Sequence, residues 1–264
     1  MALADLFECF LLDLDGTLYR GGEPVRNAVA AVRQLRDGGR RLVFMTNNSS
    51  RTPEEVADKL ARVGFEADPS EVVTSGLVTA RMLARRGVAT AFVVGEKGIR
   101  QALIEEGIRI LDDRPGAVDC VVVGWDTTAD YSKLKTACLL VQHGASLVAT
   151  NPDGAFPAAD GLWPGAGALL AVVTTTTGAV PEVVGKPYAP LFEAAREAAG
   201  GGRPLVVGDR LDTDVVGAAR LGWGSLLVLT GITSREDLGS SEVAPTFLGD
   251  DLLALFDPPV PFRR

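Results

Sequence analysis

The stretch CFLLDLDGTLYRGG, Cys9–Gly22, joins an apolar run to two aspartates, Asp13 and Asp15, and then to a glycine and a threonine. The apolar run is typical of a buried strand, and residues two apart on a strand project to the same side. The two carboxylates are therefore expected to converge, and a hard cation such as Mg²⁺ relieves their repulsion. An aspartate-rich turn that closes a strand explains the same residues equally well.

Similar short apolar runs recur along the chain, and each is followed by a turn and a helix-like stretch. This alternation predicts an α/β protein with a parallel sheet and helices on both faces. Open sheets of this kind bind ligands at the carboxyl edge of their strands. The expected helices span residues 25–38, 53–63, 75–86, 96–106, 131–143, 165–177, 188–199 and 212–221.

The composition narrows the class of protein. The 264 residues carry 26 Lys and Arg against 34 Asp and Glu, a net charge of -8, which argues against a nucleic-acid partner. The N-terminal stretch has no basic signal-like region and no apolar run reaches the length of a membrane helix, so a cytoplasmic protein with no membrane contact is expected. Three cysteines in apolar runs are expected to be structural thiols, and the single histidine, His143, to end a helix.

Two further stretches carry polar groups next to an apolar run. In VFMTNNSSRTPEE, Thr46 and Asn47 follow a strand and precede a helix, so their side chains and free backbone N–H groups suit a phosphate. A polar loop with ordinary helix capping is the competing interpretation. In VVGKPYAPLFEAA, Lys186 lies between a glycine and a proline. It is a surface lysine or a fixed cation beside a phosphoryl group.

The stretch PLVVGDRLDTDVVGAA places three acids after a predicted strand. Capping and the helix dipole account for Asp212 or Asp214. They account poorly for Asp209, which directly follows a buried run and a glycine, so metal ligation is the alternative. Each of the four polar stretches lies at the carboxyl end of a predicted strand or in the loop that follows it.

Together these stretches resemble the haloacid dehalogenase superfamily of aspartate-nucleophile phosphatases. The resemblance is greatest to subfamily IIA, the NagD-like and p-nitrophenyl phosphatase-like branch with a C2-type cap. It extends over nearly the whole chain, through LLDLDGTLYRG, TNNSSRTPEE, TNPDGAFPAADGLWPGAGAL, VGKPYAPLF, VGDRLDTDVVGA and LTGITSREDL. It implies a Rossmann-like doubly wound parallel-sheet core, residues 1–79 and 183–264, with an inserted α/β cap domain, residues 80–182.

The resemblance also implies catalytic roles. Asp13 would be the nucleophile that forms an aspartyl-phosphate, and Asp15 the general acid and base. Lys186 would neutralise the phosphoryl charge and hold Asp13. Mg²⁺ would be bound by Asp13, the backbone carbonyl of Asp15, Asp209 and Asp214, with Asp214 binding a metal-bound water or Lys186 instead as an open alternative.

Substrate contacts are implied in the same way. Thr46 and Asn47 would bind the phosphoryl group, and a cap loop would contact the rest of a small phosphate ester. The cap residues implied for that contact are Asn151, Asp153 and Phe156. A connector loop without substrate contact is the alternative.

The expected function is a Mg²⁺-dependent phosphatase for a small organic phosphate. Glycerol phosphate or phosphoglycolate is favoured over a sugar phosphate, a nucleotide or pyridoxal phosphate, and homodimers through the cap occur in the branch that the chain resembles. A dehalogenase on the same fold would leave Asp15 without a use, because a halide needs no proton. A non-catalytic phosphate-binding or regulatory module is the remaining alternative.

Overall fold

The computed structural model describes residues 1–112, 116–158 and 160–263, and it divides into two compact units. Unit 1 comprises residues Met1–Thr46, Val56–Val73 and Lys186–Arg264, and unit 2 comprises Asn47–Glu55 and Thr74–Gly185. The chain therefore passes between the units four times. Residues 47–55, 74–79 and 183–185 lie in unit 2, whereas the sequence-based boundaries assign them to the core. The boundary at 79/80 falls inside a helix that begins at Ser75 and packs against the next helix of unit 2.

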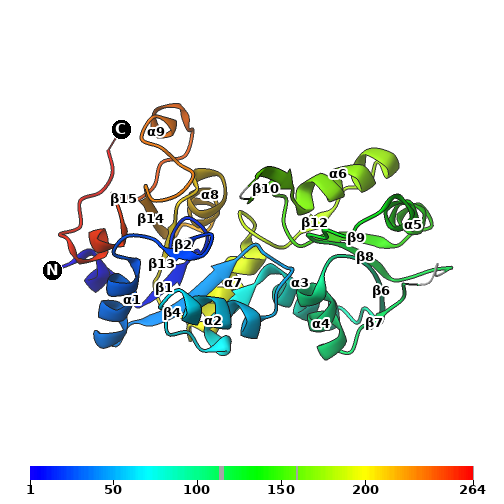
Figure 1. Ribbon diagram of the computed structural model, residues 1–264, viewed down its shortest axis with the longest axis horizontal. Helices are drawn as coiled ribbons and strands as arrows, with labels where there is room; N and C mark the ends of the chain where they lie inside the picture. Colours follow the sequence, from blue (N-terminus) through cyan, green and yellow to red (C-terminus); the bar gives the residue numbers. More distant parts are fainter. Residues whose placement is uncertain (113–115, 159, 264) are drawn as a thin grey trace. The chain divides into compact units, whose positions relative to one another are not determined.

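Unit 1 contains a sheet of six strands (Figure 1), and its neighbours β1–β13, β1–β4, β13–β14 and β14–β15 are parallel, as the apolar runs predict. The strand order is β15-β14-β13-β1-β4-β5, so β1 lies between β13 and β4. A short antiparallel hairpin follows β1. The strands are β1 (Cys9–Leu12), β2 (Tyr19–Arg20), β3 (Glu23–Pro24), β4 (Arg41–Thr46), β5 (Val72–Thr74), β13 (Pro204–Gly208), β14 (Gly224–Val228) and β15 (Phe247–Gly249).

Helices cover both faces of this sheet. One face packs against helices α1 and α2 in a cluster that includes Phe10, Leu35, Phe44 and Leu60, all fully buried or nearly so. Helix α7 packs against β1 and β4, and α8 packs against β14. The helices of unit 1 are α1 (Ala28–Asp37), α2 (Pro53–Arg62, whose first turn belongs to unit 2), α7 (Ala189–Ala198), α8 (Val216–Arg220) and α9 (Asp237–Ser240).

Unit 2 is a second α/β structure with a parallel sheet in the order β12-β9-β8-β6-β7. Its core packs β6, β8 and β9 against α5 and α6, and α3 packs against α4. The strands are β6 (Thr90–Val94), β7 (Arg109–Ile110), β8 (Cys120–Val123), β9 (Ser146–Ala149), β10 (Ala155–Ala158), β11 (Gly161–Pro164) and β12 (Glu182–Val183). The helices are α3 (Ser75–Arg85), α4 (Lys97–Glu105), α5 (Tyr131–Gln142) and α6 (Ala166–Thr177).

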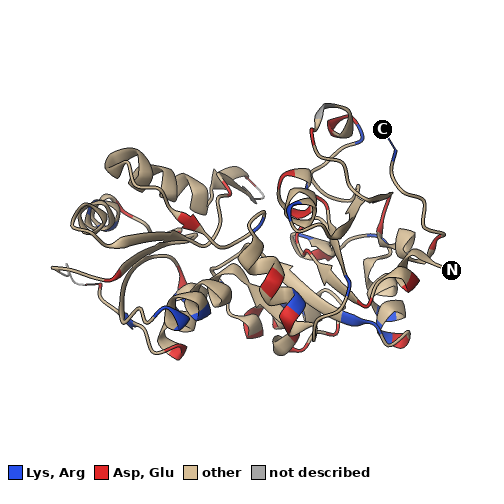
Figure 2. Cartoon of the chain, turned by 180° about the vertical axis from the view of Figure 1, so that it is seen from behind, with Lys and Arg blue, Asp and Glu red and all other residues tan. Residues whose placement is uncertain are grey.

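Local sequence signals account for the helix ends. The Thr52 hydroxyl accepts a hydrogen bond from the backbone N–H of Glu55, whose carboxylate accepts one from the Thr52 N–H, which confirms the expected capping box. Gly178 ends α6 in the left-handed conformation, and His143 caps the C-terminus of α5. Basic and acidic residues are interspersed in each unit (Figure 2). None of the helices within the described ranges is long and apolar enough to span a membrane.

Candidate active site

Three neighbouring strands of unit 1 end in polar residues. Asp13 follows β1, Thr46 is the last residue of β4, and Asp209 follows β13. Because the strands are parallel, these residues lie at one edge of the sheet. Asp13 continues the ladder for one more residue, since its N–H donates to the carbonyl of Val207 at 2.8 Å. The structure thereby brings together candidates that are nearly 200 residues apart in the sequence.

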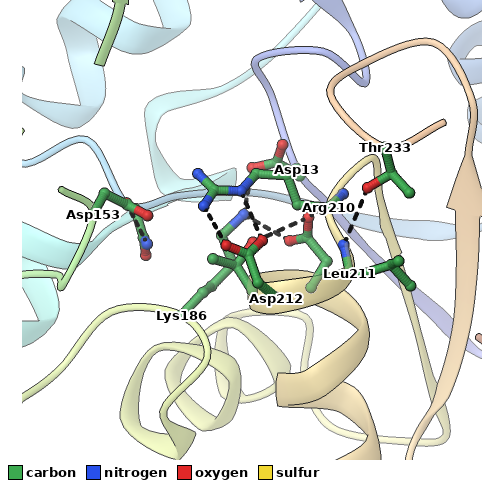
Figure 3. Close-up of polar contacts among 10 residues, drawn as sticks. Asp13, Asp153, Lys186, Arg210, Leu211, Asp212 and Thr233 are labelled. Carbon is green, nitrogen blue, oxygen red and sulfur yellow. Dashed lines mark hydrogen bonds and ion pairs between the residues drawn. The ribbon is translucent and has the colours of Figure 1, made fainter. Parts of the chain in front are cut away.

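Lys186 lies in the middle of this site and is buried, with only 3% of its surface exposed. Its ammonium donates to Asp13 Oδ1 (Figure 3). It also donates to Asp214 Oδ1 at 2.7 Å. Burial alone would lower the pKa of Lys186, but the two carboxylates outweigh it and raise that pKa. Lys186 is therefore a fixed cation, and the alternative of a solvated surface lysine is wrong.

Asp13, Asp209 and Asp214 form a buried group in which one carboxylate oxygen of each lies within 4.8 Å of the others. Burial raises the pKa of all three carboxyls to about 6. Lys186 opposes this rise at Asp13 and Asp214, and the charge of Asp214 adds to it at Asp209. When all three are ionised, the lysine neutralises one of three negative charges. The remaining two match a divalent cation.

One carboxylate oxygen of Asp209 is a candidate metal ligand. Its Oδ2 accepts a hydrogen bond from the N–H of Ile232 at 2.6 Å. Its Oδ1 is buried and has no hydrogen-bond partner among the described residues. An unpaired buried carboxylate oxygen is costly unless it binds something. Hard oxygen donors in a net-negative pocket fit Mg²⁺ well.

Two glycines make room for the Asp209 carboxylate. A Cβ on Gly16, whose φ is +85°, would lie 2.5 Å from Asp209 Oδ2, and a Cβ on Gly231 would lie 1.7 Å from the same atom. Gly16 is also in a conformation that other residues adopt only with strain. The loop after β14 and the turn after β1 thus close around Asp209 because both positions lack a side chain.

The three aspartates after β13 differ in burial and in their partners. Asp209 and Asp214 are buried, whereas the Asp212 side chain is 69% exposed and pairs with Arg210 at 2.7 Å. Asp214 also accepts a hydrogen bond from the Arg210 N–H at 3.3 Å. Asp214 accepts the hydrogen bond from Lys186 described above. Pairing with Lys186 is one of the two roles predicted for Asp214. The residues Leu211–Val215 form a π-helical turn that leads into α8.

Asp15 follows the end of β1, and its side chain is half-exposed. Strand β1 ends at Leu12, so the argument that residues two apart on a strand face the same way does not apply to Asp13 and Asp15. The Asp15 side chain is 54% exposed and contacts the Lys59 ammonium at 3.8 Å and the Tyr19 hydroxyl at 3.4 Å. Its charge still acts on the buried group, because it is one of the causes that raise the pKa of Asp13. The role that the resemblance implies for its backbone carbonyl is unaffected.

The pair Thr46 and Asn47 is divided between the units. Thr46 is 5% exposed at the end of β4. The Asn47 side chain donates to Asp153 Oδ2 at 2.9 Å, and its carbonyl accepts hydrogen bonds from Ser75 Oγ at 2.6 Å and Asn151 Nδ2 at 2.8 Å. Asn47 thus anchors a second polar group, within unit 2.

Two of the candidates in unit 2, Asn151 and Asp153, are joined by hydrogen bonds, and the third, Phe156, packs on another aromatic ring. The Asp153 N–H donates to Asn151 Oδ1 at 3.1 Å, which joins both residues to Asn47. Phe156 stacks on Trp125, with ring centroids 4.4 Å apart and an interplanar angle of 28°. The Trp125 indole N–H donates to the Pro164 carbonyl at 3.1 Å. The sequence patterns do not single out Trp125, which lies in the loop just after β8 and is the stacking partner of Phe156.

Comparisons with known proteins agree with this geometry. Residues 10–109 match the family of haloacid dehalogenase-like hydrolases, and residues 183–255 match a second, HAD-hydrolase-like family. The chain is 40% identical to the 5'-nucleotidase YutF of Bacillus subtilis over 93% of this chain and 96% of that protein. It is 37% identical to an acid sugar phosphatase of Staphylococcus epidermidis over 93% and 95% of the two chains.

A solved structure is similar over nearly the whole chain. It is the glycerol phosphate phosphatase of Mycobacterium tuberculosis in complex with magnesium, with a TM-score of 0.90 and 40% identity, covering 97% of this chain and 78% of that one. The match is global, since it extends over both units. By sequence, by fold and by the arrangement of its buried acids and lysine, this chain belongs to the haloacid dehalogenase-like hydrolases.

Proposed function

We propose that this protein is a Mg²⁺-dependent phosphomonoester hydrolase that acts on a small organic phosphate through an aspartyl-phosphate intermediate. The observation that carries the proposal is the buried group in which Lys186 pairs with Asp13 and Asp214 while Asp209 keeps one oxygen open. Relatives named as phosphatases of sugar phosphates and glycerol phosphate support the same reaction.

The metal would be held by the carboxylates of Asp13 and Asp209 and by the backbone carbonyl of Asp15, with Asp214 close by. Its chemistry is to neutralise charge on the phosphoryl oxygens. The net charge of the buried group and the open oxygen of Asp209 support Mg²⁺ binding. The mycobacterial relative, whose structure was solved in complex with magnesium, supports the same cofactor.

In the first step, a carboxylate oxygen of Asp13 forms a bond to phosphorus while the ester P–O bond breaks. The electron pair leaves with the alcohol oxygen, which takes a proton from Asp15. Lys186 holds Asp13 in the ionised form and offsets charge that spreads over the phosphoryl oxygens. The products of this step are the free alcohol and the aspartyl-phosphate.

In the second step, Asp15 is a carboxylate again and accepts a proton from water as the water oxygen attacks phosphorus. The bond between Asp13 and phosphorus breaks, and inorganic phosphate leaves. Asp13 is thereby restored as a carboxylate and Asp15 as the acid. Thr46 and Asn47 are proposed to bind the phosphoryl group throughout, and the contact of Asn151, Asp153 and Phe156 with the leaving group stays a prediction.

The proposal is tested by phosphate release from a panel of phosphate esters with purified protein. We expect turnover with Mg²⁺ and its loss when the metal is chelated. The panel compares glycerol phosphate and phosphoglycolate with a sugar phosphate, a nucleoside monophosphate and pyridoxal phosphate, and the first two are expected to react fastest. Absence of phosphate release from every ester, including p-nitrophenyl phosphate, would contradict the proposal and favour a phosphate-binding module.

The substitution Gly231→Ala tests the Mg²⁺ site through the space around Asp209. The new methyl group would overlap the Asp209 carboxylate, so this side chain must move. We expect apparent Mg²⁺ affinity to fall about tenfold or more, the size of effect seen when the support of a metal ligand is lost. Affinity is measured by Mg²⁺-dependent thermal stabilisation and by the Mg²⁺ dependence of turnover.

Gly239→Ala is the matched control, because a Cβ at Gly239 would meet nothing within 4 Å. It is expected to leave Mg²⁺ affinity unchanged within about twofold. Equal Mg²⁺ affinity for Gly231→Ala and the unmodified protein would argue that Asp209 does not bind the metal.

A further inference from the structure

Asp15 is held by two side chains that the reaction scheme above does not use. One is Tyr19, the first residue of β2. The backbone returns there, since the Gly16 N–H donates to the Tyr19 carbonyl at 2.8 Å. The Tyr19 hydroxyl then donates to Asp15 Oδ2 at 3.4 Å, while Tyr19 as a whole is only 3% exposed. A buried, packed ring is a rigid support for the hydroxyl at its tip.

The second side chain is Lys59, which comes from helix α2. Its ammonium lies 3.8 Å from the centroid of the Tyr19 ring and 3.8 Å from Asp15 Oδ1. The aromatic ring attracts the cation, so the lysine is held next to the carboxylate. Each oxygen of Asp15 therefore has its own contact, Oδ1 with Lys59 and Oδ2 with Tyr19.

These contacts contribute little to folding. An ion pair between side chains that are 27% and 54% exposed is screened by water. They matter for geometry, because a half-exposed aspartate otherwise turns freely among its rotamers. A general acid must place its proton within hydrogen-bond reach of the leaving oxygen. Fixing both carboxylate oxygens keeps Asp15 in one orientation.

We propose that Lys59 and Tyr19 are positioning residues that orient the Asp15 carboxylate for proton transfer to the leaving alcohol. The inference rests on the proposed phosphatase function. It predicts that loss of either residue slows the reaction more for an ester with a poor leaving group than for one with a good leaving group. The reason is that a poor leaving group depends more on the proton from Asp15. Phenyl phosphate and p-nitrophenyl phosphate have nearly the same shape, but phenolate is the more basic leaving group. A comparison of the two esters therefore measures how much the rate depends on proton transfer to the leaving group.

The test compares kcat/KM of Lys59→Met on these two esters, because kcat/KM reports only the steps through formation of the aspartyl-phosphate, in which the leaving group departs. We expect kcat/KM for phenyl phosphate to fall about tenfold, a fraction of what general acid catalysis contributes, and kcat/KM for p-nitrophenyl phosphate to fall less than about threefold. Lys59→Arg should restore the ratio of the two rates, since arginine also pairs with a carboxylate and an aromatic ring.

Tyr19→Phe is the second variant, because it removes only the hydroxyl and keeps the packed ring. It should shift the rate ratio in the same direction. Arg40→Met is the matched control: Arg40 pairs with Asp5 at 2.7 Å, with side chains 30% and 44% exposed, elsewhere in unit 1. This variant should leave the ratio unchanged.

An equal fall in kcat/KM on both esters, or the same shift of the ratio in Arg40→Met, would overturn the positioning role while the unmodified protein remains active. Failure of the proposed function has a different signature. In that case the unmodified protein releases phosphate from neither ester.

Discussion

Asp13→Asn is expected to abolish Mg²⁺-dependent phosphate release from p-nitrophenyl phosphate, with a loss of about 10⁴-fold or more. The amide that replaces the carboxylate has nearly the same size, but it is a poor nucleophile and cannot carry the phosphoryl group. The buried position of Asp13 at the end of β1 also prevents a water molecule from taking its place without a shift of the surrounding residues. Initial rates in the presence of Mg²⁺ measure the effect.

The fold of Asp13→Asn should be intact. Burial already raises the pKa of Asp13 to about 6, so a neutral side chain of the same shape is tolerated there. Lys186 keeps its hydrogen bond to Asp214. We expect the thermal midpoint of the metal-free protein to stay within about 5 °C of the unmodified protein.

Asp212→Asn provides the matched control. Asp212 lies between Asp209 and Asp214 in the sequence, but its side chain is exposed and pairs only with Arg210 among the described contacts. Its substitution should change kcat by no more than about twofold. Substantial turnover by Asp13→Asn, or a comparable loss in Asp212→Asn, would show that Asp13 is not the nucleophile.

Lys186→Met should weaken both the reaction and the fold. Removing the ammonium leaves Asp13 and Asp214 buried side by side without their shared cation. Loss of a partner from a buried ion pair typically costs about 3–5 kcal/mol of unfolding free energy. Loss of one preorganised electrostatic group costs about 10²–10³-fold in kcat. Urea unfolding of the metal-free protein and initial rates with Mg²⁺ measure the two effects.

The stability deficit of Lys186→Met should grow with pH. Carboxyls with a raised pKa in the folded state bind protons there more readily than in the unfolded chain, so they favour the folded state at low pH. In the unmodified protein this contribution is lost as pH rises to about 6, the pKa of Asp13 and Asp214. Without Lys186 both pKa values rise further, and the loss continues above pH 6. The deficit is therefore expected to be larger at about pH 8 than at about pH 5.

Lys97→Met is the control for this stability effect. Lys97 pairs with Glu55 at 2.5 Å, but its side chain is 64% exposed. Such a pair contributes at most about 1 kcal/mol, and the variant should show no growing deficit between the two pH values. A Lys186→Met protein as stable as the unmodified one at about pH 8 would contradict the buried ion-pair network.

Much of the fold could be predicted because its signals are local. Apolar runs such as those of β1, β4 and β13 mark strands, and capping residues such as Thr52 and Gly178 mark helix ends within a few positions. Parallel strands then bring Asp13, Thr46 and Asp209 to one edge by geometry alone. The sequence by itself determined the α/β class and which strand ends carry the chemistry.

Only the tertiary structure decided what each polar side chain does. Asp209, Asp212 and Asp214 look alike in the sequence, yet two are buried and one is exposed. Asp13 and Asp15 also look alike in the sequence, yet Asp13 pairs with the buried Lys186, whereas Asp15 is half-exposed and contacts Lys59 and Tyr19.

The same holds for partners that lie far apart in the chain. Trp125 under Phe156 and Lys59 beside Asp15 have no local signal that links them. The sequence is compatible with Lys186 as a surface lysine or as a fixed cation. Its burial between two carboxylates shows that it is a fixed cation. Burial, and the partner that compensates it, depend on contacts between distant segments. Local residue patterns determine strands and turns, whereas these long-range contacts determine which charged side chains are buried and which remain solvated.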